Sequence, residues 1–171
     1  MTARRLGDAA RTALACVATV VCATIPTTGC TTVVAPTARP APVAATSTGA
    51  VEFYTAVHRD VLTALSAEFP ELAFEPRYAS TTAGCTLPDG TAGVTVHLPI
   101  QGSDAPVPVA ELDRAAAVFE RTAARAGFRD RQVLPPDTGF TIRLFAADGS
   151  YITFGSYIAA TVGLTVGCYR E

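Results

Sequence analysis

The sequence contains no tryptophan and no lysine, a single methionine and only two histidines. All 13 basic side chains are arginines, a bias typical of a GC-rich genome that carries no information about chemistry. The formal net charge is −2, and residues 30–171 hold ten arginines against fourteen aspartates and glutamates, so this part is near −4. Because nucleic-acid binding needs a basic stripe, this balance excludes nucleic acid as the main partner.

Motifs that carry catalysis or hold cofactors are also absent from the sequence. It has no glycine-rich phosphate loop, no Gly-x-Ser-x-Gly, no His-Glu-x-x-His, no Cys-x-x-Cys and no calcium loop. His58 lies beside the apolar stripe of a predicted helix, and His97 lies on the outward side of a predicted strand. Asp89 and Asp148 each precede a glycine and are expected to serve turns first. We therefore expect a protein that is not an enzyme and that holds no cofactor or metal.

The N-terminus has the composition of a targeting segment. Arg4, Arg5 and Arg11 give it a positive start, and residues 13–25 form an apolar run of 13 residues. Such a run is short for a membrane span but suits the apolar core of a signal peptide. The sequence therefore predicts export from the cytoplasm.

The residues before Cys30 resemble the signal of bacterial lipoproteins, in which a cysteine is acylated and becomes the new N-terminus. Gly29 fits this pattern, whereas Thr27 stands where the pattern prefers leucine. The resemblance implies a signal peptide over residues 1–29 and a lipid on Cys30, which makes the membrane a partner and the extracytoplasmic face of the cell membrane the location. Two alternatives stay open, namely ordinary secretory cleavage, for instance after Ala23, and an uncleaved anchor.

Residues 31–50 have the composition of a spacer. They contain three prolines, one charge, many small residues and no aromatic residue. Such a segment cannot bury enough apolar surface to offset the cost of ordering, so we expect a disordered, partly extended tether. The predicted organisation is a signal peptide (1–29), a lipidated cysteine with its tether (30–50) and one α+β domain (51–171).

Within the domain, hydrophobic periodicity predicts helices and strands. Apolar residues recur every three or four positions over 51–69 and 109–126, which predicts two amphipathic helices. Residues 72–80 predict an edge strand, because Pro76 cannot donate to a ladder. Period-two alternation predicts four further strands, over residues 93–100, 140–146, 151–158 and 161–168.

The order of these elements predicts the fold class. The sequence α-β-β-α-β-β-β predicts an α+β fold with two helices packed on one face of a mostly antiparallel sheet of four to five strands. Asp148-Gly149 predicts a hairpin turn between two of the strands. Residues 80–91, 101–108 and 129–139 are expected to be loops, and the first of them contains the turn signal Pro88-Asp89-Gly90.

The five cysteines separate by position. Cys16 and Cys22 lie in the predicted signal peptide, and Cys30 lies at its end. Cys85 and Cys168 remain in the domain, where two cysteines of an exported protein most simply form one disulfide. Cys168 falls in the inward register of its strand. A metal pair is disfavoured, because neither cysteine has a second cysteine or histidine at ligand spacing.

One face of the predicted sheet is a candidate binding site. If the helices cover the face that carries the valines, leucines and isoleucines, Ile100 and Ile158 among them, the opposite face carries mixed aromatic and polar residues. We interpret this face as a candidate partner-binding face for a protein or a small apolar ligand. The alternative is ordinary cross-strand pairing on a half-exposed sheet. The face consists of His97, Arg143, Phe145, Tyr151 and Tyr157, with threonines between them.

The signal that ends at Cys30, the Thr/Pro tether, the order of helices and strands, and the positions of Cys85 and Cys168 resemble the small lipoproteins of actinobacteria. Many of these are mycobacterial and have no assigned activity. The tether, the single disulfide and the absence of paired catalytic groups lead us to expect a cell-surface, lipid-anchored accessory or binding protein, with an envelope protein or a small apolar ligand as its partner. The alternative is a small cell-envelope enzyme, or an inhibitor of one, that uses the loops around Cys85 and Pro135.

Overall fold

The computed structural model describes residues 43–135 and 139–171. The predicted signal peptide, Cys30 and residues 31–42 of the predicted tether therefore lie outside the described residues. Within the described part, no helix is both long enough and apolar enough to cross a membrane.

The described residues form two helices and a single antiparallel sheet of eight strands. The helices are α1 (Ser47–Glu68) and α2 (Leu112–Arg125), and a short 3₁₀ turn η1 (Val109–Glu111) precedes α2. The strands are β1 (Glu75–Tyr78), β2 (Thr81–Thr86), β3 (Ala92–His97), β4 (Ile100–Gly102), β5 (Asp130–Val133), β6 (Phe140–Phe145), β7 (Tyr151–Ser156) and β8 (Ala160–Tyr169).

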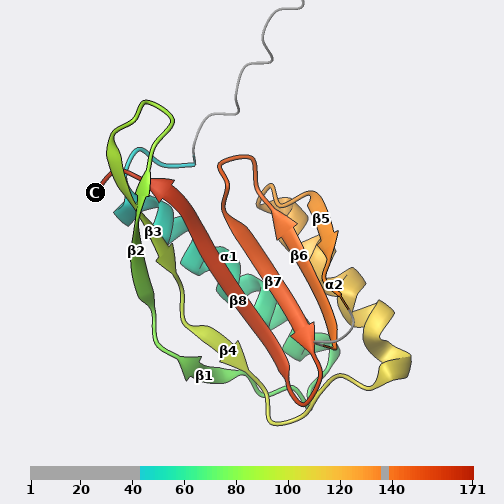
Figure 1. The fold of residues 1–171 in the computed structure, drawn as a ribbon. Helices are drawn as coiled ribbons and strands as arrows, with labels where there is room; N and C mark the ends of the chain where they lie inside the picture. The colour runs from blue at the N-terminus through green and yellow to red at the C-terminus, as the bar shows by residue number, and fades with distance from the viewer. Residues whose placement is uncertain (1–42, 136–138) are drawn as a thin grey trace, which may run out of the picture. The chain divides into compact units, whose positions relative to one another are not determined.

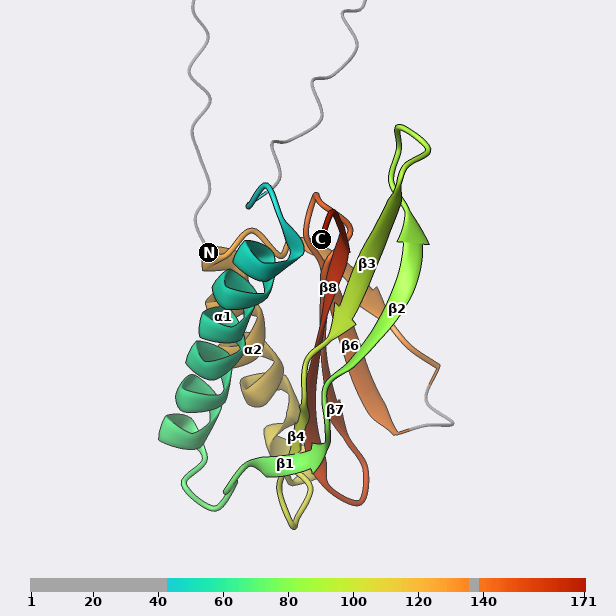
Figure 2. The ribbon, with the colours of Figure 1, turned by 90° about the vertical axis from the view of Figure 1, so that its left-hand side faces the viewer.

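Both helices pack on one face of the sheet, and no described element covers the other face (Figures 1 and 2). This arrangement confirms the predicted α+β class. The predicted count of four to five strands is wrong, because β2, β5 and all of β4 except Ile100 fall in segments that we expected to be loops. β2 and β5 are short and mostly exposed, so no buried face imposes an alternating pattern on their sequences, and β4 has only three residues, too few to show one.

The long strand β8 organises the sheet. Strand β7 pairs along one of its edges, while β4 and β3 pair in succession along the other edge. Beyond them, β1 pairs with β4 and β2 pairs with β3, whereas β6 and β5 follow β7 (Figure 1). β1 is an edge strand, as Pro76 predicted, and the hairpin at Asp148-Gly149 connects β6 to β7.

Helix α1 begins earlier than its apolar stripe predicts. Its N-cap is Thr46, whose side chain accepts a hydrogen bond from Gly49 N at 3.4 Å. Residues 47–50 are therefore helical and not part of an extended tether. Helix α2 begins at Leu112 and ends just before Gly127, whose φ of 91° suits the left-handed conformation that ends helices.

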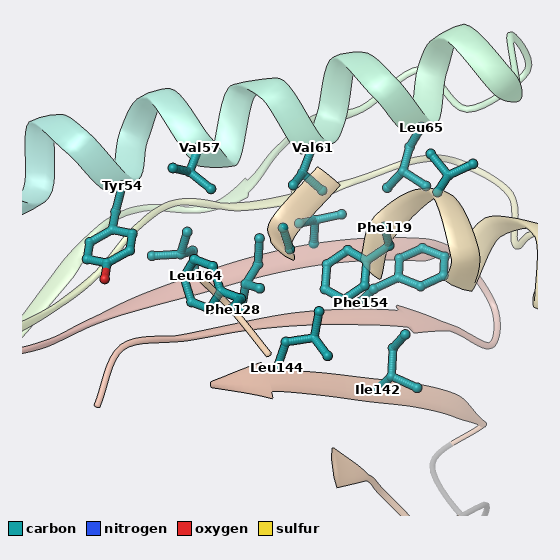
Figure 3. Close-up of a cluster of buried hydrophobic side chains, with 14 of the residues drawn as sticks. Tyr54, Val57, Val61, Leu65, Phe119, Phe128, Ile142, Leu144, Phe154 and Leu164 are labelled. Carbon is teal, nitrogen blue, oxygen red and sulfur yellow. The ribbon is translucent and has the colours of Figure 1, made fainter. Parts of the chain in front are cut away.

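The core lies between the two helices and the inner face of the sheet. Tyr54, Val61 and Leu65 of α1 are fully buried against β8, and Phe119 of α2 packs on Phe154 of β7 with ring centroids 5.5 Å apart (Figure 3). The alanines of α2 allow close approach to the strands. This single core holds the sheet rigid, so side chains on its outer face have fixed relative positions.

One predicted register is wrong. Cys168 does not continue the buried series of Val162, Leu164 and Val166, because Tyr169 takes the buried position instead. The pairing of β3 with β8 shifts between Val94 and Val96, which is a β-bulge or a similar irregularity. A bulge adds a residue to one strand and so exchanges its inward and outward positions.

Candidate functional site

Four strands bring a row of predicted face residues together on the open side of the sheet. His97 of β3 lies opposite Thr165 of β8, Thr165 lies opposite Tyr151 of β7, and Tyr151 lies opposite Phe145 of β6. We call these four residues the aromatic row. They come from positions up to 68 residues apart in the sequence, and the sheet register alone aligns them.

The members of the aromatic row contact one another. His97 Nδ1 lies 3.0 Å from Thr165 Oγ1, and the rings of Tyr151 and Phe145 have centroids 5.7 Å apart at an angle of 50°. His97, Phe145 and Tyr151 are half-buried. Cross-strand pairs of this kind stabilise a sheet by about 0.2–1 kcal/mol each, so these contacts also suit a purely structural role.

Arg143 adds a cation to the aromatic row. Its guanidinium carbon lies 4.6 Å from the centroid of the Tyr151 ring, and its Nε donates to Thr153 Oγ1 at 3.3 Å. Among the described residues, Arg143 forms no ion pair with a carboxylate, whereas Arg77, Arg114, Arg131 and Arg170 each do. A guanidinium has five N–H donors, so Arg143 retains donors for a carboxylate of another molecule.

The structure separates Tyr157 from the other predicted face residues. Tyr157 follows β7, six residues beyond Tyr151, which is about 20 Å along a strand. It packs on Gly139, where an added Cβ would lie 2.6 Å from Tyr157 Cβ. Tyr157 remains 70% exposed. The predicted face is therefore two surfaces, the aromatic row with Arg143 and a second one around Tyr157.

This second surface is a groove of about 620 Å³ at the end of the sheet where β8 begins. We call it the Tyr78–Tyr157 groove. Tyr78 and Ile158 are 69% and 79% exposed beside Tyr157, and Gly102 and Gly155 line it without side chains. Large exposed apolar residues that gather around one groove indicate an interaction surface.

The sequence placed two residues of this groove on the wrong face. Ile100 follows Leu98-Pro99, where β3 ends and the chain enters β4, and Gln101 rather than Ile100 lies opposite the buried Val162. Ile158 lies beyond the end of β7 in an exposed turn. Pro99 is the signal that could have revealed the first change, because proline interrupts a strand ladder.

The opposite end of the sheet carries the predicted disulfide between Cys85 and Cys168, with Cα atoms 5.9 Å apart. The bond passes beside Gly93 of β3, where a Cβ would lie 2.9 Å from Cys168 Sγ. It links β2 to β8 across β3. The described residues contain no group of three or more histidine, cysteine or acidic side chains that could hold a metal.

Near the disulfide, Asp148 joins three elements. It accepts hydrogen bonds from Tyr54 Oη of α1 at 2.7 Å, from Tyr169 Oη of β8, and from Ser150 N at 2.9 Å. Burial raises the pKa of Asp148, but the hydrogen bonds from Tyr169, Ser150 and Tyr54 outweigh it and hold the pKa below its ordinary value. Burial and the Asp148 carboxylate raise the pKa of both tyrosines. The cluster has a structural role, because its hydrogen bonds connect α1, the hairpin of β6 and β7, and β8.

The two histidines have ordinary structural partners. His58 of α1 is buried, and its Nε2 lies 3.3 Å from Val162 O. Burial lowers the pKa of His58, so the ring is neutral at pH 7. Neither His58 nor His97 has a carboxylate partner among the described residues. Neither one lines the Tyr78–Tyr157 groove.

Comparison with known proteins identifies a family and a fold. A family model for LppA, described as a lipoprotein confined to pathogenic Mycobacterium, matches residues 45–171. A crystal structure of a DUF4853 family protein from Actinomyces odontolyticus is similar with a TM-score of 0.54 and 14% identity, and the match covers 71% of this chain and 68% of that chain. At this identity the likeness concerns the fold alone. The search of curated proteins gives no match.

Proposed function

Because the chain belongs to the LppA family of lipoproteins, we propose that it is a lipid-anchored accessory protein that binds a partner at the cell envelope and catalyses no reaction. Family membership supports a membrane-associated protein of the envelope. The observation that carries the binding role is the aromatic row, with Arg143 stacked on Tyr151, on the open face of the sheet.

In this proposal the anchor is a lipid on Cys30, on the extracytoplasmic face of the cell membrane. The match to the family begins at residue 45, so it does not include Cys30 and the anchor needs its own support. Two or three acyl chains, at about 0.8 kcal/mol per buried methylene, would hold the protein stably where a single chain would not.

Metabolic labelling with an alkyne fatty acid tests the anchor. The wild-type chain should carry the label and sediment with membranes, whereas Cys30→Ala should lose the label and leave the membrane fraction. Cys22→Ala is the matched control and should behave as wild type, because Cys22 lies in the segment that is removed. A labelled Cys30→Ala chain would contradict the proposal.

The shape of the aromatic row favours a protein over a small molecule as the partner. Small-molecule sites are concave and bury most of their ligand, whereas the aromatic row lies on the face of a sheet. Tyrosine, phenylalanine and arginine are enriched in protein interfaces, where they supply rigid contact area. The free donors of Arg143 suit a partner that places a carboxylate beside an apolar surface.

Substitution of the aromatic row tests the binding role. The double variant Phe145→Ser/Tyr151→Ser removes both rings, and Arg143→Gln removes the cation but keeps a polar side chain. Crosslinking in intact cells followed by affinity purification should recover the envelope partner about tenfold less from either variant, the size expected for loss of an interface hot spot. Phe53→Ser on α1 is the control, because this exposed ring lies on the helical side.

The fold of each variant is verified by formation of the Cys85–Cys168 disulfide and by its melting temperature. Equal recovery of the partner from folded variants and from wild type would contradict the proposal, since the row would then serve only cross-strand pairing.

The proposal contains no catalytic step. His58 and His97 bond to Val162 O and Thr165 Oγ1, and among the described residues neither is oriented by a carboxylate as a general base would be. Among the residues that the structure describes, no comparable constellation supports the alternative of an envelope enzyme.

A further inference from the structure

Within the described residues, the strands at the free edges of the sheet differ in how they are protected against pairing. β5 carries Asp130 and Arg131, and β1 carries Glu75, Pro76 and Arg77. Charges and prolines are the usual devices that prevent two edge strands from joining. β2 has neither a charge nor a proline, since its sequence is Thr-Thr-Ala-Gly-Cys-Thr. Five of its six residues are nevertheless exposed, and Cys85 is half-buried.

The hydrogen-bond pattern identifies the backbone groups that β2 leaves free. Leu87 N donates to Thr91 O at 2.8 Å, which fixes the alternation of the ladder. The backbone N–H and C=O groups of the odd-numbered residues of β2 therefore point toward β3. In an antiparallel ladder the alternate residues point their N–H and C=O groups the other way. Thr82, Gly84 and Thr86 therefore present their backbone donors and acceptors to the open edge.

Gly84, in the middle of β2, is not required by the fold of its own chain. Its φ does not lie in the left-handed region, and an added Cβ would meet no atom within 4 Å. Gly93 on the neighbouring strand differs, because the disulfide occupies the place of its side chain. Gly84 therefore leaves its backbone groups and the space beside them open to another strand.

We propose that β2 pairs with β2 of a second copy of this chain, antiparallel, across a twofold axis at Gly84. Gly84 then exchanges two hydrogen bonds with Gly84 of the second copy, and Thr82 exchanges two with Thr86 of the second copy. This register uses every free backbone group of β2 and extends the two sheets into one. If the twofold axis lay between two residues of β2, even-numbered residues of one copy would lie opposite odd-numbered residues of the other. The backbone groups of the odd-numbered residues already bond to β3, so such a register could not form its hydrogen bonds.

A second copy suits this edge better than a flexible peptide does. β2 is uncharged, so two copies bring no like charges together. Thr82 lies opposite Thr86 of the second copy, and threonine pairs hydrogen-bond across strands. The disulfide from Cys85 to β8 holds β2 in its extended form, so both sides of the interface are ordered before they meet and little conformational entropy is lost.

Native mass spectrometry of the full chain, released from detergent over a dilution series, tests the pairing. The wild type should be a dimer at high concentration and dissociate on dilution. Gly84→Pro removes the N–H that both central bonds require, and should raise the dissociation constant about tenfold or more. Gly84→Ala keeps the N–H and has space for its methyl group, so its dissociation constant should stay within about threefold of wild type.

Hydrogen exchange on the wild-type chain gives a measurement that needs no variant. The amides of Thr82, Gly84 and Thr86 should exchange slowly at dimer concentrations and fast in the monomer. A chain that stays monomeric, a dimer that Gly84→Pro leaves intact with its disulfide formed, or a monomer in which these three amides are protected would each overturn the proposal. The last outcome would assign the edge to the chain's own N-terminal segment.

Discussion

His58 illustrates how one buried side chain makes stability depend on pH. Burial lowers its pKa below the ordinary 6.5. As the pH falls below about 6.5, His58 is protonated in the unfolded chain but stays neutral in the folded chain. The free energy of unfolding therefore has its full value above this pH and decreases as the pH falls toward the pKa of His58 in the folded chain. The pKa values of Asp89 (about 2) and Asp148 are lowered from the ordinary 3.8, so these carboxylates change stability below about pH 4 and not between pH 7.5 and 5.5.

We therefore predict that the free energy of unfolding, measured by urea titration, is lower at pH 5.5 than at pH 7.5. His58→Gln retains a donor for Val162 O but does not titrate, so its loss over the same interval should be smaller than that of wild type. An equal loss in both proteins would show that another group causes the dependence.

Single residues also show where prediction from sequence stops. The turn role of Asp148 follows from its neighbour Gly149, and Asp148 does accept from Ser150 N. Its bonds to Tyr54 and Tyr169 join residues 94 and 21 positions away, and no local pattern encodes them. Likewise, alternation predicts that Tyr151 and Arg143 face outward, but only the pairing of β6 with β7 places the guanidinium over the ring.

Among the elements, those with a continuous buried face could be predicted and those without one could not. Helix α2 and strands β6, β7 and β8 have apolar positions in phase, and each was predicted to within a few residues. β2 and β5 have no buried side, so their sequences are free of the period that identifies strands. The second surface around Tyr157 was missed for the same reason, since its large exposed side chains lie in the short strands β1 and β4 and in the turn after β7.

The hairpin of β2 and β3 depends on the disulfide more than on packing. The bond spans 83 positions of sequence, and the chain-entropy treatment gives such a loop about 4–5 kcal/mol of stability. The double variant Cys85→Ser/Cys168→Ser should lose about this amount by thermal or urea unfolding. Its hairpin amides should exchange faster than those of α1, because β2 has almost no buried surface. A variant within about 1 kcal/mol of wild type, with an equally protected hairpin, would contradict this account.

At the scale of the molecule, the two ends of β8 carry different features: the start of α1 and the disulfide lie at one end, and the Tyr78–Tyr157 groove lies at the other. Val43, the first described residue, leads into α1, and Ser47 N donates to Arg170 O at the end of β8. The Tyr78–Tyr157 groove lies at the start of β8, about 30 Å away along ten residues of strand. The start of α1 and the disulfide share one end of the sheet, the groove lies at the other, and the aromatic row faces outward between them.

The fold class could be predicted from sequence, because one helical and one alternating period are enough to place two helices on one face of a sheet. The lipoprotein character could also be predicted, from Cys30 and the residues before it, and the family match agrees with it. The sequence could not predict which residues of the open face lie together, because this depends on how β3 and β4 share one edge of β8.

The central claim is that the open face of the sheet, and not the helical side, meets the partner. A photoreactive phenylalanine analogue at Tyr151 tests it in intact cells, with the same analogue at Phe53 on α1 as the control. We expect position 151 to yield a crosslinked envelope protein that is lost with Arg143→Gln, and position 53 to yield none. Crosslinking from position 53 alone, or from neither position, would contradict it.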